Sequence, residues 1–387
     1  MPEILSARAI LDRLVAFPTV SRGGNLALID WVQDYLDGHG IRTGRVDMPC
    51  GTKAQLYAHV GPDLPGGVML SGHSDVVPVD GQDWTTDPWR VTEADGRLYG
   101  RGTCDMKGFD ALAIAALVRA RDLPLARPLQ LALSCDEELG CMQVVHLIRA
   151  VAADLPRAGA VIVGEPSMMK VVTGHKGGVA YAVQMRGYEV HSSIQHRGVS
   201  AVMEAARLVM WANDRNAESA ARPPAPPAVP FDPPWTSVHV GMIAGGTAHN
   251  ITARDCSFQI GFRTVPGDDP EDWCAAFEAE AARVEAGMKR IRPEAGVTVR
   301  RIFDMPALRP EPAGAAEALV RRLTGDNGSH VVSYGTEGGQ FQAAGFSAVV
   351  CGPGDIAQAH QPDEYITLAQ FEAGGAFLDR VIETLRD

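Results

Sequence analysis

The sequence predicts an α/β protein whose mainly parallel sheet is interrupted by a smaller, inserted α+β domain. Short apolar runs that end in glycine or in a polar residue alternate with helical patterns near both ends of the chain, as in a covered parallel sheet. Between these regions the pattern changes to alternating strands and two longer helices. The 387 residues suffice for two to three domains of about 150 residues each.

The first part of the chain contains two predicted helices, followed by strands that alternate with a third helix. Residues 4–16 carry apolar side chains at helical spacing, and Phe17-Pro18 ends this helix. A second helix is expected at 24–37 and ends at Gly38. The remaining elements are three short apolar strands, at 67–72, 129–134 and 160–164, and one helix rich in alanine and leucine, at 110–120.

A change of pattern after Lys176 marks the inserted domain. Its expected elements are a strand, a helix, two strands, a helix and a strand, at 179–185, 200–213, 237–243, 256–263, 270–291 and 297–303. This βαββαβ order is that of a ferredoxin-like unit. The stretch 222–234 is too rich in proline for a helix or a central strand, and we expect it to be a loop.

After Pro306 the α/β pattern resumes with an expected helix at 313–324 and a buried strand at 347–351. The simplest interpretation is one α/β domain built from both ends of the chain. We therefore expect two domains, with the bounds 1–176 together with 306–387, and 177–305.

The composition restricts the compartment and the partners that we expect. The net charge of 35 − 47 = −12 argues against non-specific binding of nucleic acid, which requires neutralisation of phosphates. The longest apolar run, Ala111 to Val118, is too short to span a membrane, and the N-terminus lacks the apolar segment of a signal peptide. Seven cysteines without a CxxC motif indicate reduced thiols. We therefore expect a cytoplasmic protein without nucleic-acid or membrane partners.

Five polar stretches carry the candidate chemistry, and they centre on His73 with Asp75, on Asp105, on Glu137 with Glu138, on Glu165 and on His360. Each stretch has an ordinary structural explanation when it is taken alone: a histidine at a strand end, a helix N-cap or a solvated acidic turn. Four of the five, however, follow predicted buried strands. Because ligands of open α/β sheets bind outside the carboxyl ends of the strands, we expect these side chains to gather at one edge of the sheet.

The types of these residues predict a metal centre. Imidazole and carboxylate groups are suitable ligands for Zn²⁺, Co²⁺ or Mn²⁺. Five ligands are too many for one catalytic zinc ion but suit two metals that share a carboxylate and a water. A carboxylate such as Asp75 can accept the second ring N–H of His73. Since Glu137 and Glu138 are adjacent and point in different directions, one can bind metal while the other acts as general base.

Motifs for other activities are absent or weaker. The chain contains no HExxH and no GxSxG. The stretch Gly352-Pro353-Gly354-Asp355-Ile356-Ala357 fits a dinucleotide-binding GxGxxA pattern. It lies too near the C-terminus for a following βαβ unit, and Pro362 cuts the next helix short.

Taken together, these motifs resemble the M20 family of di-zinc aminoacylases and peptidases over essentially the whole chain. The stretches HSDVVP, GRGTCDMKG, DEELG, GEPS and AHQPDEY occur in the order and spacing of that family. The chain is most similar to the branch that removes the acetyl group from N2-acetyl-L-ornithine, through GTCDMKGF, GHKGG, HSSIQHRGVSA and YGTEGGQF. A desuccinylase of succinyl-diaminopimelate, or another hydrolase of N-acyl amino acids or dipeptides, remains an alternative within the family.

The resemblance implies a role for each candidate residue of the metal centre. It implies two Zn²⁺ ions, with Co²⁺ or Mn²⁺ as substitutes. His73 and Glu165 would bind one metal, Glu138 and His360 would bind the other, and Asp105 would bridge the two. Asp75 would orient His73. Glu137 would be the general base that activates the bridging water for attack on the amide carbonyl, and then the acid that protonates the leaving amine.

The resemblance also implies roles for the inserted domain, which would form a homodimer and close over a small-molecule N-acyl amino acid. His191 would reach the active site of the partner subunit and stabilise the oxyanion. Asn250 and Arg263 would contact the carboxylate of the substrate, for which a guanidinium fork is well suited. Glu337 would pair with the free δ-amine of acetylornithine. An equally simple explanation of Glu337 is a carboxylate at a helix N-terminus.

Overall fold

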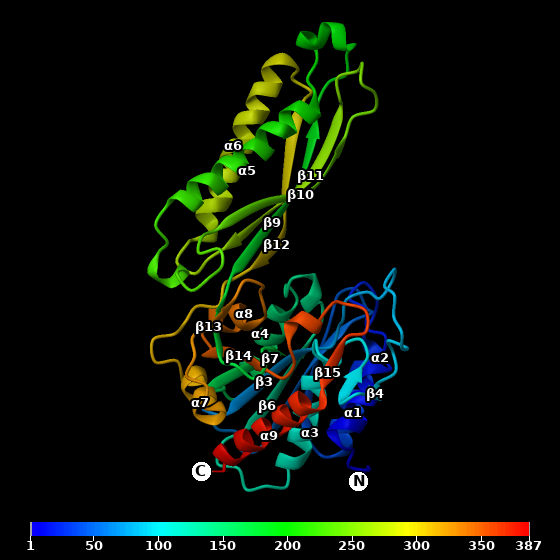
Figure 1. Cartoon of the computed structure of the whole chain (residues 1–387), viewed down its shortest axis with the longest axis vertical. Helices are drawn as coiled ribbons and strands as arrows, with labels where there is room; N and C mark the ends of the chain where they lie inside the picture. The colour runs from blue at the N-terminus through cyan, green and yellow to red at the C-terminus, as the bar shows by residue number, and fades with distance from the viewer. Residues whose placement is uncertain (1, 387) are drawn as a thin grey trace. The chain divides into compact units, whose positions relative to one another are not determined.

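The computed structural model describes residues 2–386, which form two compact units. The first unit contains the chain up to Gly174, Leu308–Val331 and the residues from Thr336 onward. The second unit contains His175–Ala307 and Val332–Gly335. Elements from both ends of the chain therefore share the first unit, as the blue and red segments of Figure 1 show.

The first unit is built on an eight-stranded sheet of order β1-β2-β6-β3-β7-β14-β8-β13. Its strands are β1 (Arg42–Asp47), β2 (Ala54–Val60), β3 (Val68–His73), β6 (Leu129–Ser134), β7 (Ala160–Pro166), β8 (Val172–His175), β13 (His330–Val332) and β14 (Ala348–Gly352). The α/β class predicted from the sequence is thus confirmed.

The sheet is mixed, however, and the prediction of a mainly parallel sheet was wrong at its edges. The central strand β3 is parallel to β6 and β7, and β7 is parallel to β14. By contrast, β1 pairs antiparallel with β2, β2 with β6, and β14 with β8. The connection from β1 to β2 is only a few residues long. A connection this short reverses the chain, because a parallel pair needs a longer crossover.

Helices cover this sheet and enclose the core. They are α1 (Ala7–Val15), α2 (Leu26–Gly38), α3 (Lys107–Ala120), α4 (Val144–Asp154), α7 (Ala315–Thr324), α8 (Gly338–Ala343) and α9 (Leu368–Thr384). Helix α3 is buried on almost every side, because it contacts β3 and β6 as well as α1 and α9. Its many alanines allow this close packing. The strands β3, β6 and β7 are buried along their whole length, as expected of central strands.

A small three-stranded sheet of order β15-β5-β4 completes the first unit. It consists of β4 (Thr92–Ala94), β5 (Arg97–Tyr99) and β15 (Tyr365–Thr367), none of which was predicted. Strands β5 and β15 pair antiparallel, with Tyr99 opposite Tyr365. This pairing brings the segment that precedes β15 next to the segment that follows β5, and both segments carry candidate ligands.

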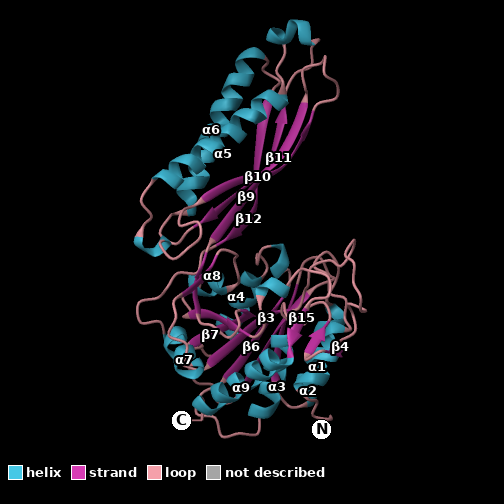
Figure 2. Ribbon diagram, viewed as in Figure 1, coloured by secondary structure: helices cyan, strands magenta, loops and turns pink. Residues whose placement is uncertain are grey.

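The second unit is an antiparallel sheet of order β10-β11-β9-β12 with two long helices on one face (Figure 2). In chain order its main elements are β9 (Gly177–Arg186), α5 (Ala201–Ala221), β10 (Ser237–Gly245), β11 (Asp255–Thr264), α6 (Pro270–Ile291) and β12 (Gly296–Met305). Alternate side chains of β9 and β11 join one apolar core with α5 and α6. No helix among residues 2–386 is long and apolar enough to cross a membrane.

Candidate metal centre

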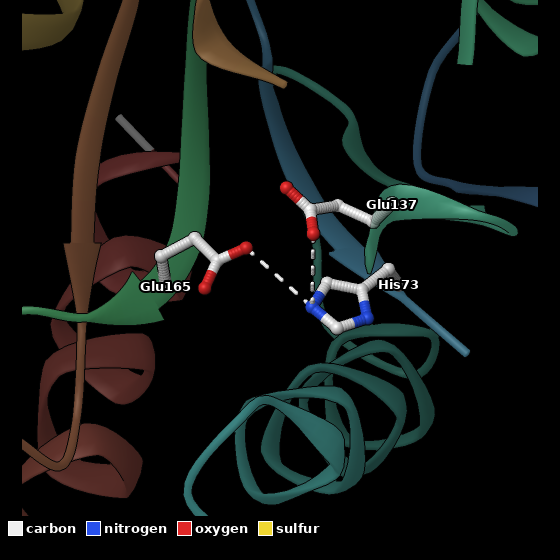
Figure 3. Close-up of side chains that lie close together, drawn as sticks. All are labelled: His73, Glu137 and Glu165. Atoms are coloured by element: carbon white, nitrogen blue, oxygen red, sulfur yellow. Dashed lines mark ion pairs between the residues drawn. The ribbon is translucent and has the colours of Figure 1, made fainter. Parts of the chain in front are cut away.

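Three neighbouring parallel strands deliver four of the candidate residues to one edge of the main sheet. His73 is the last residue of β3, Glu165 lies near the end of β7, and Glu137 and Glu138 lie in the short 3-10 helix η1 (Glu137–Leu139) that follows β6. Because these strands are parallel, their carboxyl ends meet. The side chains of His73, Glu137 and Glu165 point toward one another (Figure 3).

The ring of His73 is the centre of the first group. Its Nε2 atom lies 3.1 Å from Asp105 Oδ1, 3.5 Å from Glu165 Oε1 and 4.0 Å from Glu137 Oε2. His73 is almost completely buried. Asp105 arrives from the loop between β5 and α3, so the small sheet and the main sheet both contribute to this group.

His360 forms the second group with the opposite oxygen of Asp105. The Nε2 atom of His360 lies 3.2 Å from Asp105 Oδ2 and 3.0 Å from Glu138 Oε2. The two oxygens of Asp105 therefore face two different histidines. This is the arrangement that a carboxylate shared between two metals requires.

Burial and ion pairing change the protonation of these groups. Burial, with the charge of Asp105, raises the pKa of Glu165 to about 8, and burial raises the pKa of Glu137 well above its usual value. Burial acts in the same direction on Asp105, but hydrogen bonds from the two histidines outweigh it and lower its pKa. Hydrogen bonds to Asp105 and Glu138 raise the pKa of His360 to about 10. The crowded carboxylates thus need compensating positive charge.

The donor set fits divalent cations. Two groups of side chains, His73 with Glu137 and Glu165, and His73 with Asp105 and Glu138, each offer ligand atoms within 4.8 Å of one another. Among the described residues, the buried Oε1 atom of Glu138 has no hydrogen-bond partner. A buried carboxylate oxygen without a partner is costly unless a cation or water meets it. Nitrogen and oxygen ligands in this number suit a pair of zinc-like ions.

Asp75 holds the turn that carries the two glutamates. Its Oδ1 accepts a hydrogen bond from the N–H of Glu137 (3.1 Å), and its Oδ2 accepts hydrogen bonds from the N–H of Glu138 (3.3 Å) and from Ser21 Oγ (2.7 Å). We expected this carboxylate to orient His73. The Nδ1 atom of His73 lies 2.9 Å from the main-chain carbonyl of Asp75 and 3.7 Å from its carboxylate.

Glu364, which was not predicted as a site residue, holds the loop that carries Asp105. Its Oε1 accepts hydrogen bonds from the N–H groups of Cys104 (2.9 Å) and Asp105 (3.0 Å). Its Oε2 pairs with the fully buried guanidinium of Arg101 at 2.7 Å. Glu364 belongs to the motif AHQPDEY, in which only His360 was predicted to be a site residue. The partners of Glu364 lie more than 250 residues away in the chain, and local pattern does not reveal them.

Glu337 is buried at the start of α8, with both carboxylate oxygens engaged. Its Oε2 accepts a hydrogen bond from Ser71 Oγ in β3 (3.1 Å), and its Oε1 accepts one from Ser134 Oγ in β6. Burial raises the pKa of Glu337 to about 7. The predicted contact between Glu337 and the substrate stays a prediction.

The other three candidate residues, His191, Asn250 and Arg263, belong to the second unit and are exposed there. His191 and Asn250 lie on adjoining segments, since the N–H of Ser192 donates to the carbonyl of Asn250 (2.8 Å). Ser193 contacts the Nδ1 atom of His191 at 2.8 Å. Arg263 lies on β11, with its guanidinium carbon 5.9 Å from the centre of the Phe303 ring. The roles assigned to these residues also stay predictions.

Comparison with known proteins agrees with the resemblance drawn from the motifs. The sequence profile of Peptidase family M20/M25/M40 matches residues 69–384. An acetylornithine deacetylase of Myxococcus xanthus is 36% identical over 395 residues, covering 99% of this chain and 98% of that protein. An acetylornithine deacetylase of Proteus mirabilis is 31% identical and covers 96% of this chain and 94% of its own length.

Solved structures agree on the fold. An M20-family metallo-carboxypeptidase from Sulfolobus solfataricus superposes with a TM-score of 0.78 at 16% identity, over 100% of this chain and 99% of that one. A dinuclear metal-binding peptidase of the M20 family from Bacillus subtilis gives a TM-score of 0.67 at 13% identity, over 98% and 97% of the two chains. The family profile and the curated relatives span nearly the whole chain. The chain therefore belongs to peptidase family M20/M25/M40 and is a metal-dependent hydrolase of amides.

Proposed function

We propose that this hydrolase removes the acetyl group from N2-acetyl-L-ornithine in the cytoplasm, yielding acetate and L-ornithine for arginine biosynthesis. The observation that carries this proposal is the 36% identity with an acetylornithine deacetylase over nearly the full length of both chains. The grouping of His73, Asp105, Glu138, Glu165 and His360 at one sheet edge supports it, because this donor set is the one that amide hydrolysis by paired metals requires.

In this proposal the site binds two Zn²⁺ ions, for which Co²⁺ or Mn²⁺ can substitute. His73 and Glu165 would hold one ion and Glu138 and His360 the other, and Asp105, whose two oxygens face the two histidines, would be a ligand of both. Divalent cations bound here polarise the amide carbonyl and lower the pKa of water. Glu364 keeps the Asp105 loop in place through the N–H of Asp105 itself.

Glu137 carries the proton in the proposed reaction. Its Oε2 faces His73 and accepts a proton from the attacking water. It then delivers this proton to the amine nitrogen of the departing ornithine. The hydrogen bond from its backbone N–H to Asp75 holds the start of the turn in place during this transfer. A carboxyl group whose pKa is raised by burial is a suitable base and acid for such a step.

The second unit supplies binding groups and the dimer contact in the proposal. His191 stabilises the oxyanion in the partner subunit, and Asn250 and Arg263 bind the carboxylate of the substrate. The homodimer forms through β10, the edge strand of the four-stranded sheet, and the neighbouring helix α5. Five large apolar side chains are exposed on these two elements: Val202, Met203, Met210, Met242 and Ile243. An exposed edge strand with apolar side chains favours pairing with another chain.

Hydrolysis of a substrate panel tests the proposal. The panel contains N-acetylornithine, succinyl-diaminopimelate and several neutral N-acetyl amino acids, each assayed with added Zn²⁺ or Co²⁺ and again after chelation. The proposal expects metal-dependent hydrolysis with the highest kcat/KM for N-acetylornithine. A preference for another member of the panel would retain the mechanism and replace the substrate. Turnover that survives complete chelation would contradict the metal assignment.

A further inference from the structure

The side chain of Cys141 lies against one oxygen of Glu137. The Sγ atom of Cys141 is 2.9 Å from Glu137 Oε1, while Glu137 Oε2 lies 4.0 Å from His73 Nε2. Cys141 is only 2% exposed, so this contact is shielded from solvent. The two oxygens of the carboxylate therefore have different surroundings: a thiol on one side and the metal centre on the other.

The backbone around Cys141 holds its thiol in this position. The N–H groups of Gly140 (2.7 Å) and Cys141 (2.9 Å) both donate to the carbonyl of Glu137. The turn needs a φ of +57° at Cys141, a value uncommon for a residue with a side chain. From helix α8, Gln340 Nε2 donates to the carbonyl of Cys141 at 3.1 Å. The backbone that carries the thiol is thus held from two sides, by its own turn and by a separate helix.

We propose that Cys141 is a positioning residue for the catalytic base: its S–H group donates to Glu137 Oε1 and thereby turns Oε2 toward the metal centre. This inference rests on the proposed role of Glu137. Without the thiol, the carboxylate can rotate about its side-chain bonds, because Asp75 holds only the backbone N–H of Glu137. A thiol is a weak hydrogen-bond donor, so it orients the carboxylate without greatly reducing its affinity for a proton.

Two substitutions at Cys141 test the proposal in the metal-loaded, full-length protein. Cys141→Ala removes the donor, and we expect kcat to fall by about tenfold or more, as misplacement of a catalytic group does. KM and the bound metal should stay within about twofold of the native values, because no proposed ligand or substrate contact is lost. Cys141→Ser keeps a donor at nearly the same place, and most of the native kcat should return.

Two controls separate orientation from a general effect on folding. Cys135→Ala removes another buried thiol of the same segment. Among the described residues no hydrogen bond joins that thiol to Glu137, so kcat should change little. In the Glu137→Ala background, Cys141→Ala should leave the residual turnover unchanged, since the thiol acts through the glutamate.

The outcomes distinguish this proposal from the proposed function. If Cys141→Ala keeps its kcat within twofold while Glu137→Ala is inactive, Cys141 has no positioning role and the base assignment stands. If Glu137→Ala is itself active, the base assignment fails first. If Cys141→Ala does not fold, the serine variant decides: a folded serine variant with kcat lowered more than tenfold would overturn the proposal, and a near-native kcat would support it.

Discussion

The metal centre of the first unit and the predicted substrate contacts of the second unit are constructed differently. In the first unit, His73, Asp105 and Glu165 are buried; His73 and Glu165 lie at the ends of β3 and β7, and Asp105 lies two residues before α3. In the second unit, His191, Asn250 and Arg263 are exposed on loops or on the open face of a sheet. The difference teaches that the buried ligands of the metal centre are held in place by the groups packed around them. The three exposed residues of the second unit are enclosed by fewer neighbouring groups.

The energetic reason lies in the cost of burying charge. A buried carboxylate persists only where hydrogen bonds or opposite charges compensate for lost solvation. Asp75 and Glu364 each accept three hydrogen bonds or ion pairs from surrounding groups, and this fixes the segments that carry the ligands. Exposed side chains need no such compensation, so their positions are less constrained. Substitutions in the two regions should therefore differ in their effects on metal content, stability and turnover.

The largest effect is expected for Asp105→Ala. This change removes the carboxylate whose two oxygens face both histidines, so both metals and turnover should be lost together. Metal content by elemental analysis, measured beside the hydrolysis rate, checks the prediction. Asp355→Ala is a useful control, since Asp355 caps a short helix and is not a proposed ligand. Full metal content in the Asp105 variant would contradict the bridging assignment.

Glu137→Ala should lower kcat by about 10²- to 10⁴-fold, the usual contribution of a general base. Unlike Asp105→Ala, it should leave the metal content nearly intact, because Glu137 is assigned to proton transfer. Single-turnover rates and metal analysis on the same preparation make this comparison. A variant with full metal-dependent activity would remove Glu137 from the mechanism.

His191→Ala should reduce kcat by about 10²-fold if this side chain stabilises the oxyanion. Metal content and thermal stability should not change, because His191 is exposed and belongs to the second unit. His196→Ala serves as the matched control, as His196 is an exposed histidine of the same short segment. Equal, small losses in the two variants would argue against a specific role for His191.

Glu337→Gln tests whether Glu337 contacts the substrate or only links two buried strands of the main sheet. If Glu337 pairs with the δ-amine, KM for acetylornithine should rise about tenfold, while KM for neutral N-acetyl amino acids stays the same. If it instead only joins Ser71 of β3 to Ser134 of β6, KM for all substrates should stay the same. An unchanged KM for acetylornithine would thus remove Glu337 from the substrate site.

The smallest effect concerns the pH dependence of stability. The pKa of Glu337 is about 7 in the folded protein and about 4.3 in an unfolded chain. Between these values the folded state binds more protons, so the free energy of unfolding should fall as pH rises from about 4 to 7. Glutamine does not titrate, so Glu337→Gln lacks this fall in stability. The free energy of unfolding of Glu337→Gln minus that of the native protein should therefore rise by about 1–3 kcal/mol from pH 5 to pH 8. Urea unfolding at matched metal content measures this. The same stability difference at both pH values would contradict the raised pKa.

Local sequence pattern was sufficient where an element is long, apolar or clearly capped. Helix α6 has the predicted bounds, Pro270–Ile291, because Asp269 caps it, Pro270 opens it and its apolar residues recur at helical spacing. Strand β6 also has the predicted bounds, since Leu129–Ser134 is a short apolar run. Helix α9 was missed. It contains Gly374 and Gly375, which disfavour helix, and Gly374 lies where a side chain would collide with Leu112 and Pro353.

By itself, the sequence determined the α/β class, the family and the set of candidate ligands, because motifs at the ends of apolar strands are local features of the chain. Only the tertiary structure decided which side-chain and backbone atoms form hydrogen bonds with one another. The Oε1 atom of Glu364 reaches the N–H of Asp105, Glu337 reaches Ser71 and Ser134, and the carbonyl of Asp75 faces His73. Most of these partners lie far apart in the chain. They meet because strands such as β5 and β15 pair across the fold, and the periodicity of a single segment carries no information about such pairing.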